Sequence, residues 1–108
     1  MERYGFFGGS FNPPTYAHLE IAKKSLEFLN LDKVFFVPVG NNYKKPYLIN
    51  EKYRYDMLNL MCEDEKKIEV EDIELNKENN ISAIEAFKMI SDKYKNIEKY
   101  YIMGADNL

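Results

Sequence analysis

The stretch GFFGGSFNPPTYAHLEIA, residues 5–22, decides how this chain folds at its start. It joins a short apolar run to an amphipathic run through two glycines, a hydroxyl side chain and two prolines. His18, the only histidine in the chain, stands just inside the second run. Glycines permit positive φ values and close backbone approach, and prolines do not fit a helix interior. The stretch therefore predicts a strand, a tight turn and the first residues of a helix.

Outward from this stretch, short apolar runs and helical patterns alternate along the chain. The run KVFFVPV, residues 33–39, is almost continuously apolar, as strands are when both faces of a parallel sheet are covered. Strands that alternate with helices imply right-handed crossovers, so the sequence predicts a Rossmann-like α/β fold in the order β-α-β-α-β-α-β. The predicted strands are 3–8, 33–39, 66–75 and 98–106, and the predicted helices are 16–30, 50–62 and 80–94.

Two finer predictions concern the side chains that face the core. Asn50 is expected to cap the second helix, because asparagine is among the preferred residues at that position. The run 66–75 alternates as a half-buried strand does. The side chains expected to face the core are, in the helix, Tyr53, Met57, Leu60 and Met61 and, in the strand, Ile68, Val70 and Ile73.

Composition limits the classes of function. The chain has 108 residues, which predicts a single domain over 1–108, or part of a larger one. A net charge of −3 gives no attraction to nucleic acid or to an anionic membrane, so a phosphate ligand must be held by local donors. No apolar run approaches the ~20 residues of a membrane span, and a cytoplasmic location is expected. The single cysteine, Cys62, excludes an internal disulfide and is expected to serve packing.

The turn stands where an open α/β sheet binds its ligands, at the carboxyl ends of the strands. Residues 8–18 follow the first strand and residues 104–107 follow the fourth, and these two strands are commonly neighbours. Thr15 is expected to cap the first helix, whose N-terminus favours an anion, and His18 lies one turn further in. A phosphate fits this arrangement. Neither G-x-x-x-x-G-K-[ST] nor G-x-G-x-x-G is present.

Three motifs resemble one known family. GGSFNPPTYAHL resembles the signature of the nucleotidylyltransferase superfamily, in particular of the nicotinate- and nicotinamide-nucleotide adenylyltransferases. VPVGNNYKKPYLINEKYRYDML is similar to the phosphate-contacting loop of that family. YYIMGADNL is similar to its ribose-binding G-x-D segment. The resemblance spans the whole chain.

The sequence departs from the family pattern in two places. Thr15 stands where the common bacterial H-x-G-H form has its first histidine, and Ala17 replaces the glycine. The threonine is similar to the nicotinamide-nucleotide branch, whereas MGADNL is similar to the bacterial nicotinate branch, so the acceptor stays open. The later I-S-S-T-x-x-R-type motif of the family is absent from these 108 residues. The chain is therefore expected to be the N-terminal portion of the family domain, which makes it an incomplete domain. Efficient catalysis by these 108 residues alone is not expected.

The resemblance implies adenylyl transfer in NAD biosynthesis. The 5′-phosphate of a pyridine mononucleotide attacks the α-phosphorus of ATP, and pyrophosphate leaves, with Mg²⁺ arriving on ATP. The catalytic pair implied by the motif is His18, at the α-phosphate, with Thr15 beside it. The protein then acts through alignment and stabilisation of charge on the phosphoryl oxygens.

The resemblance also implies residues that bind the two nucleotides. Lys45 supplies a cation, and Gly104 and Asp106 hold the adenosine ribose. The residues of the turn that bind the nucleotides are Gly8, Gly9, Ser10 and Phe11, and the backbone of the last three supplies donors.

Two further assignments concern the second helix and the start of the third. Arg54 contacts phosphate or, as an alternative, forms a salt bridge within its own helix to Glu51 or Asp56. Ser82 approaches the pyridine nucleotide by its resemblance to a Ser/Thr position of the family.

Other functions remain open at this point. A related activity, such as that of a pantetheine-phosphate adenylyltransferase or a cytidylyltransferase, fits the same first motif. A catalytically silent module that still binds ATP is the alternative from a different class. Self-association through apolar surface that an incomplete domain leaves exposed is a further hypothesis.

Overall fold

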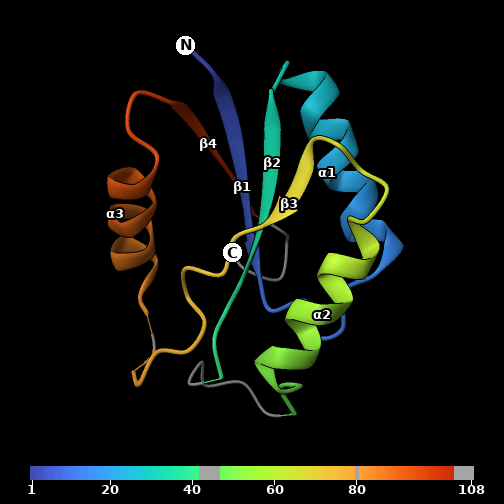
Figure 1. Cartoon of the computed structure of the whole chain (residues 1–108), viewed down its shortest axis with the longest axis vertical. Coiled ribbons are helices and arrows are strands. Elements are labelled where there is room, and N and C mark those ends of the chain that lie inside the picture. The colour runs from blue at the N-terminus through green and yellow to red at the C-terminus, as the bar shows by residue number, and fades with distance from the viewer. Residues whose placement is uncertain (42–46, 80, 104–108) are drawn as a thin grey trace.

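The computed structural model describes residues 1–41, 47–79 and 81–103. Strands and helices alternate within these ranges, which confirms the predicted order (Figure 1). The elements are β1 (Arg3–Gly9), α1 (Tyr16–Phe28), β2 (Lys33–Pro38), α2 (Glu51–Met61), β3 (Ile68–Val70), α3 (Ala83–Lys93) and β4 (Glu98–Met103).

The four strands form one parallel sheet in the order β3-β2-β1-β4. β1 lies in the interior of the sheet and pairs with β2 on one side and with β4 on the other. Near its carboxyl end Gly8 is opposite Val37 of β2 and Met103 of β4. The prediction that the first and fourth strands are neighbours is therefore confirmed, and the strand order reverses at β1.

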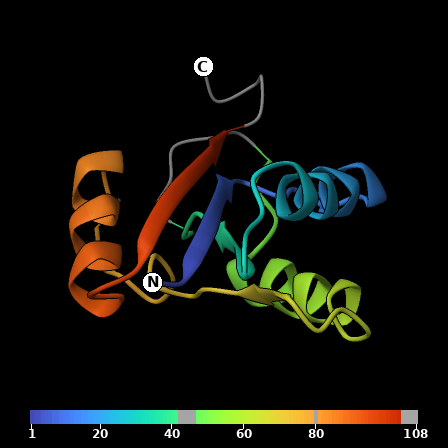
Figure 2. The ribbon, with the colours of Figure 1, turned by 90° about the horizontal axis from the view of Figure 1, so that it is seen from above.

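Helices cover both faces of the sheet: α1 and α2 lie on one face and α3 lies on the other (Figure 2). Side chains along β2 alternate between the two cores. Val34 and Phe36 belong to the cluster under α1 and α2, whereas Phe35 and Val37 belong to the cluster under α3. All four are buried, which confirms the prediction that this strand is covered on both faces.

The prediction for the inward face of α2 is wrong at two positions. Tyr53 and Leu60 are 62% and 69% exposed, whereas Arg54 and Leu58 are fully buried. The physical reason is that the guanidinium of Arg54 bonds to backbone carbonyls in the interior, which rotates the apolar Tyr53 outward. A pattern of apolar residues alone cannot show a buried arginine.

The third strand is shorter than predicted. β3 ends at Val70, and the amide of Glu71 donates to the carbonyl of Phe36 over 2.8 Å. Ile68 is buried under α1 and α2, as expected, and Val70 packs against that cluster. Ile73 lies beyond the strand and packs against the cluster under α3, because the chain crosses to the other face there.

A buried carboxylate anchors the C-terminal end of α3. Glu71 is 2% exposed and accepts from Lys93 Nζ at 2.8 Å and from the hydroxyl of Tyr94, so the C-terminal end of α3 is bound to the chain after β3. Burial and the hydrogen bond to Glu71 raise the pKa of Tyr94.

In the described ranges, no helix has both the length and the apolar character needed to cross a membrane.

Candidate functional site

The turn between β1 and α1 is organised around the ring of Phe11. This ring is 2% exposed and lies 5.2 Å from Phe36 and 5.0 Å from His18, measured between ring centroids. Phe11 has a φ of 47°, in the left-handed region that non-glycine residues adopt rarely. The expectation that glycines supply the positive φ is wrong, since no described glycine has one. The Phe11 ring packs in the aromatic cluster in this conformation.

Glycine is required in the turn for close approach. A Cβ built on Gly9 would lie 3.2 Å from the ring of Phe11, a distance at which the ring has to move. Gly9 therefore brings the backbone close to the aromatic cluster at the end of β1. The other part of the prediction for the glycine pair, close approach of the backbone, is confirmed at Gly9.

His18 caps the first helix together with Thr15. Thr15 is the N-cap residue of α1 with extended backbone angles, as predicted. Its backbone N–H donates to Nδ1 of His18 over 2.9 Å, and its hydroxyl lies 3.2 Å from the same nitrogen. His18 thus stands at the third helical position, where a capping box has Glu or Gln.

This contact fixes the tautomer of the neutral ring. A backbone N–H can only donate, so Nδ1 of His18 accepts, and the proton of the neutral imidazole is on Nε2. The first turn of α1 carries no acidic side chain that would offset the positive end of the helix dipole. The helix start therefore combines backbone amides with an imidazole donor, which is a suitable environment for an anion.

Arg54 of α2 is hydrogen-bonded to the same turn. Its Nη1 donates to the carbonyl of Ser10 at 3.0 Å and to that of Val39 at 2.6 Å, and its Nε donates to the carbonyl of Ile49 at 2.6 Å. Burial lowers its pKa, and the charge of Glu51 opposes this effect.

The alternative of a salt bridge within the helix does not hold for Arg54. Asp56 pairs with Lys52 at 3.2 Å. Glu51 accepts from the backbone amides of Asn41 and Asn76, each at 2.9 Å. Both carboxylates are therefore engaged with other partners.

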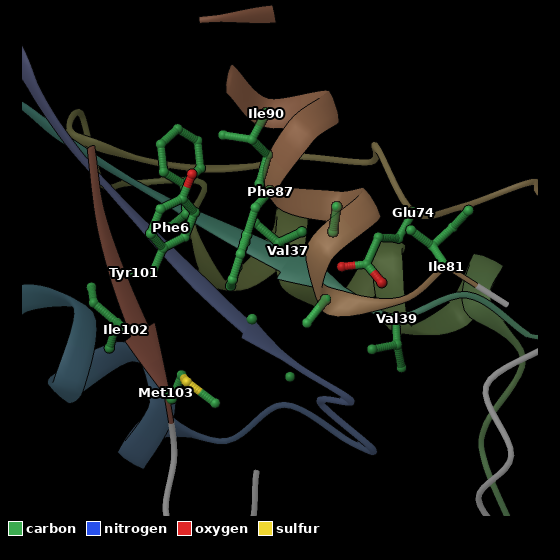
Figure 3. A pocket seen from close by; sticks show the side chains of 14 residues that line it. Phe6, Val37, Val39, Glu74, Ile81, Phe87, Ile90, Tyr101, Ile102 and Met103 are labelled. Carbon is green, nitrogen blue, oxygen red and sulfur yellow. The ribbon is translucent and has the colours of Figure 1, made fainter. Parts of the chain in front are cut away.

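A pocket of about 200 Å³ lies between α3 and the carboxyl ends of β1, β2 and β4 (Figure 3). Gly8 and Gly9 form part of its wall, so the pocket adjoins the turn. Its side chains are mostly apolar, and the carboxyl group of Glu74 points among them (Figure 3). Burial raises the pKa of Glu74 to about 7. The remaining lining residues are Phe6, Val37, Val39, Ile81, Ala83, Ala86, Phe87, Ile90, Tyr101, Ile102 and Met103.

Sequence reasoning missed Glu74. No local pattern distinguishes it from the other acidic residues between 63 and 78, because its burial depends on the placement of α3 and β2.

The predicted site residues divide into three groups. The turn and the start of α1 bring together Gly8, Gly9, Ser10, Phe11, Thr15 and His18, and Arg54 joins them through Ser10. Ser82 caps α3, where its Oγ accepts from the amide of Glu85 at 3.2 Å, and only its neighbours line the pocket. Lys45, Gly104 and Asp106 lie outside the described residues. The ligand contacts of all these residues stay predictions.

A metal site made of protein groups is not found in the ranges that the structure covers, where no three His, Cys, Asp or Glu side chains are placed to hold an ion. Mg²⁺ commonly binds through substrate phosphates with few protein ligands.

The chain has an open parallel sheet, and the turn after β1 lies where the strand order reverses, the usual place of ligand binding. These features define the class of doubly wound α/β proteins. Within this class, the chain belongs to the cytidylyltransferase-like family, whose family model matches residues 6–108. The resemblance expected from the first motif is thereby confirmed for the family.

Similar proteins carry a more specific name. A probable nicotinate-nucleotide adenylyltransferase of Clostridium novyi is 37% identical over 110 residues, covering 100% of this chain and 55% of the relative. One of Maridesulfovibrio salexigens with the same name is 35% identical over 108 residues, covering 98% of this chain and 50% of the relative. The chain thus spans about half the length of the curated relatives it matches.

The fold is shared with a solved structure. Nicotinic acid mononucleotide adenylyltransferase of Plasmodium falciparum, complexed with NaAD, superposes with a TM-score of 0.76 at 20% identity. The match covers 94% of this chain and 51% of that one. It confirms the Rossmann-like architecture.

Proposed function

We propose that the chain is the N-terminal portion of an enzyme that transfers the adenylyl group of ATP to a pyridine mononucleotide, releasing pyrophosphate, in NAD biosynthesis. In this proposal the 5′-phosphate of the mononucleotide attacks the α-phosphorus. The protein aligns the two phosphates and stabilises the charge that develops on the phosphoryl oxygens. Mg²⁺ enters with the ATP phosphates.

One observation carries the proposal. The Thr15 N–H holds Nδ1 of His18, so a neutral ring presents an Nε2–H donor at the N-terminus of α1. This donor and the backbone of Gly9, Ser10 and Phe11 belong to the same turn. In the proposal His18 and Thr15 contact the α-phosphate.

The names of the relatives favour nicotinate mononucleotide as the acceptor. The apolar pocket beside Gly8 and Gly9 has walls suited to a flat ring, with Phe87 and Tyr101 on one side. Lys45, Ser82, Gly104 and Asp106 keep the binding roles that the motif implies for them. A cytoplasmic location and the absence of nucleic-acid or membrane partners complete the proposal.

An NMR titration of the backbone amides tests this function. Mg·ATP is added to the 108-residue chain, followed by nicotinate or nicotinamide mononucleotide in separate samples. Selective shifts between Gly8 and His18 are expected with Mg·ATP, and the stronger-binding mononucleotide identifies the acceptor. A dispersed spectrum without shifts in the turn contradicts the proposal.

Two further assays separate the alternatives. Pantetheine phosphate and CTP, tested in place of the pyridine nucleotide and ATP, detect a related transferase. Binding of ATP and mononucleotide without pyrophosphate release, in a protein that also carries the downstream sequence of the relatives, selects the catalytically silent module.

A further inference from the structure

We propose that Arg54 is a positioning residue, which fixes the Ser10–Phe11 peptide so that the Phe11 N–H is presented to the ligand of the turn. The identity of that ligand as a nucleotide phosphate rests on the proposed function. The geometry of the peptide does not.

Three backbone segments meet at the guanidinium of Arg54. The carbonyl of Ser10 follows β1, that of Val39 follows β2, and that of Ile49 precedes α2. The Arg54 side chain is fully buried, and its hydrogen bonds to these segments are partly buried. One planar group therefore connects the carboxyl ends of two strands with the start of a helix.

The hydrogen bond to the Ser10 carbonyl also determines the orientation of the Phe11 N–H. In a trans peptide the C=O and N–H groups point in opposite directions. The carbonyl of Ser10 points at the buried Arg54, so the N–H of Phe11 points away from Arg54. Within the described part of the chain, no acceptor for that N–H is found.

The strained residue beside this peptide is fixed from a second side. The Asn12 side chain accepts from the Ile49 N–H at 2.7 Å and donates to the Tyr47 carbonyl at 3.0 Å. Arg54 binds the other side of Ile49 through its carbonyl. Phe11, with φ of 47°, thus lies between Ser10, which is bonded to Arg54 of α2, and Asn12, which is bonded to the segment before α2. Unfavourable backbone angles persist only where the surroundings determine them in this way.

The choice of arginine is itself informative. Its Nη2 is buried with no hydrogen-bond partner in the described part of the chain, and no carboxylate there lies within ion-pair distance of Arg54. A buried charge without a counter-ion is costly, and an apolar side chain of the same volume is often no less stabilising. A rigid fork that bonds several carbonyls at once supplies what lysine or methionine cannot.

The test compares Arg54→Lys with Arg3→Lys in the 108-residue chain. Arg3 is a matched control because its Nη2 also donates to a backbone carbonyl, that of Leu29 at 2.8 Å, at the amino end of β1. The positive φ of Phe11 is read, without ligand, from its strong intraresidue NOE between the amide and α protons. Mg·ATP affinity is read from the amide titration.

Arg54→Lys is expected to weaken this NOE and to lower Mg·ATP affinity by about 10- to 100-fold, the loss of a hydrogen bond to a charged group. Arg3→Lys is expected to change neither. An unchanged Phe11 signal with unchanged affinity overturns the inference. Lost affinity with an unchanged Phe11 signal also overturns it, because Arg54 then acts on the ligand directly.

Wild-type measurements keep the inference testable where Arg54→Lys does not fold. The Nε–H and Nη–H protons of Arg54 are expected to exchange slowly and to stay unshifted when Mg·ATP moves the Phe11 amide. Rapid exchange, or a shift of the guanidinium with ATP, overturns the inference. When wild type binds no nucleotide, the proposed function fails, while the ligand-free NOE and the exchange rates still decide the role of Arg54.

Discussion

The backbone N–H of Thr15 and Nδ1 of His18 lie 2.9 Å apart, so one side chain caps a helix and is oriented by the same hydrogen bond. These two roles belong to different nitrogens of the ring. Nδ1 serves the helix start, and Nε2 carries the proton that the proposed function uses. Substitutions that imitate one nitrogen at a time can therefore separate stability from binding.

His18→Asn retains an acceptor near the position of Nδ1, and His18→Gln places an amide donor near that of Nε2. His18→Asn is expected to change the free energy of unfolding little while it weakens Mg·ATP binding. His18→Gln is expected to bind better than His18→Asn. His18→Ala loses both functions, with a stability cost of about 1 kcal/mol for the cap. Urea unfolding and calorimetric titration measure the two effects, and equal binding by all three variants would contradict the role of Nε2.

Glu74→Gln is expected to stabilise the chain in a pH-dependent manner. Burial raises the pKa of Glu74 from 4.5 to about 7, so between these values the folded state holds a proton that the unfolded state releases. Stability therefore falls as pH rises through this window. Above this pH window, ionised Glu74 lowers the free energy of unfolding by an amount on the order of 3 kcal/mol.

Urea unfolding at pH 5 and pH 8 checks this prediction. Glu74→Gln should exceed wild type in stability at pH 8 and by much less at pH 5. Glu63→Gln, at an exposed position, is the control and should show no such difference. The same gain at both pH values would show that ionisation of Glu74 is not the cause.

Cys62 is expected to be unreactive in the folded chain. It is 7% exposed, and burial, with Glu65 and Glu69 nearby, raises its pKa to about 11. Because the thiolate is the reactive form, a disulfide reagent at pH 8 should modify it at least about 100-fold more slowly than in urea. Comparable rates in both conditions would mean that the core around Cys62 opens readily.

Leu58→Ala and Leu60→Ala test the orientation of α2. Leu58 is fully buried and Leu60 is 69% exposed, although they stand two residues apart on one helix. Leu58→Ala should reduce the free energy of unfolding by about 2–5 kcal/mol. Leu60→Ala should change it by no more than about 0.5 kcal/mol. The reverse order, measured by urea unfolding, would restore the face expected from the apolar pattern.

The self-association hypothesis predicts contact through the apolar side chains of α3 and β4. Phe87 is 40% exposed, and its ring lies 4.3 Å from that of Tyr101. Sedimentation equilibrium should show a mass that rises with concentration, and Phe87→Ser should lower it. Ile21→Ser is the control, since Ile21 is 42% exposed but lies on α1. A clean monomer at every concentration removes the hypothesis.

Much of the fold could be predicted because its signals are local. The continuous apolar run of β2, the caps at Thr15 and Asn50 and the alternation of periods depend on neighbours in the sequence. The turn was found for the same reason, since its residues are contiguous. The neighbouring positions of β1 and β4 followed from a general regularity of doubly wound sheets.

The errors have a common physical cause. Arg54 and Glu74 are charged side chains whose burial is determined by partners far away in the sequence, such as Ser10 at a separation of 44 residues. Polar residues are expected at the surface by default, so the pattern turned Tyr53 inward instead. Likewise the positive φ at Phe11 depends on contacts with distant parts of the chain, and residue type alone favoured glycine.

The hydrogen bonds from Arg54 to Ser10 and Val39 have a consequence for synthesis of the chain. The signature motif is complete once residue 18 has been made, but its conformation depends on a side chain added 36 residues later. A ribosome-bound segment that ends before α2 therefore carries the motif without the means to hold its shape. The functional unit is therefore discontinuous in the sequence. Grafting GGSFNPPTYAH between another strand and helix would transfer the motif without Arg54, the residue that orients its backbone.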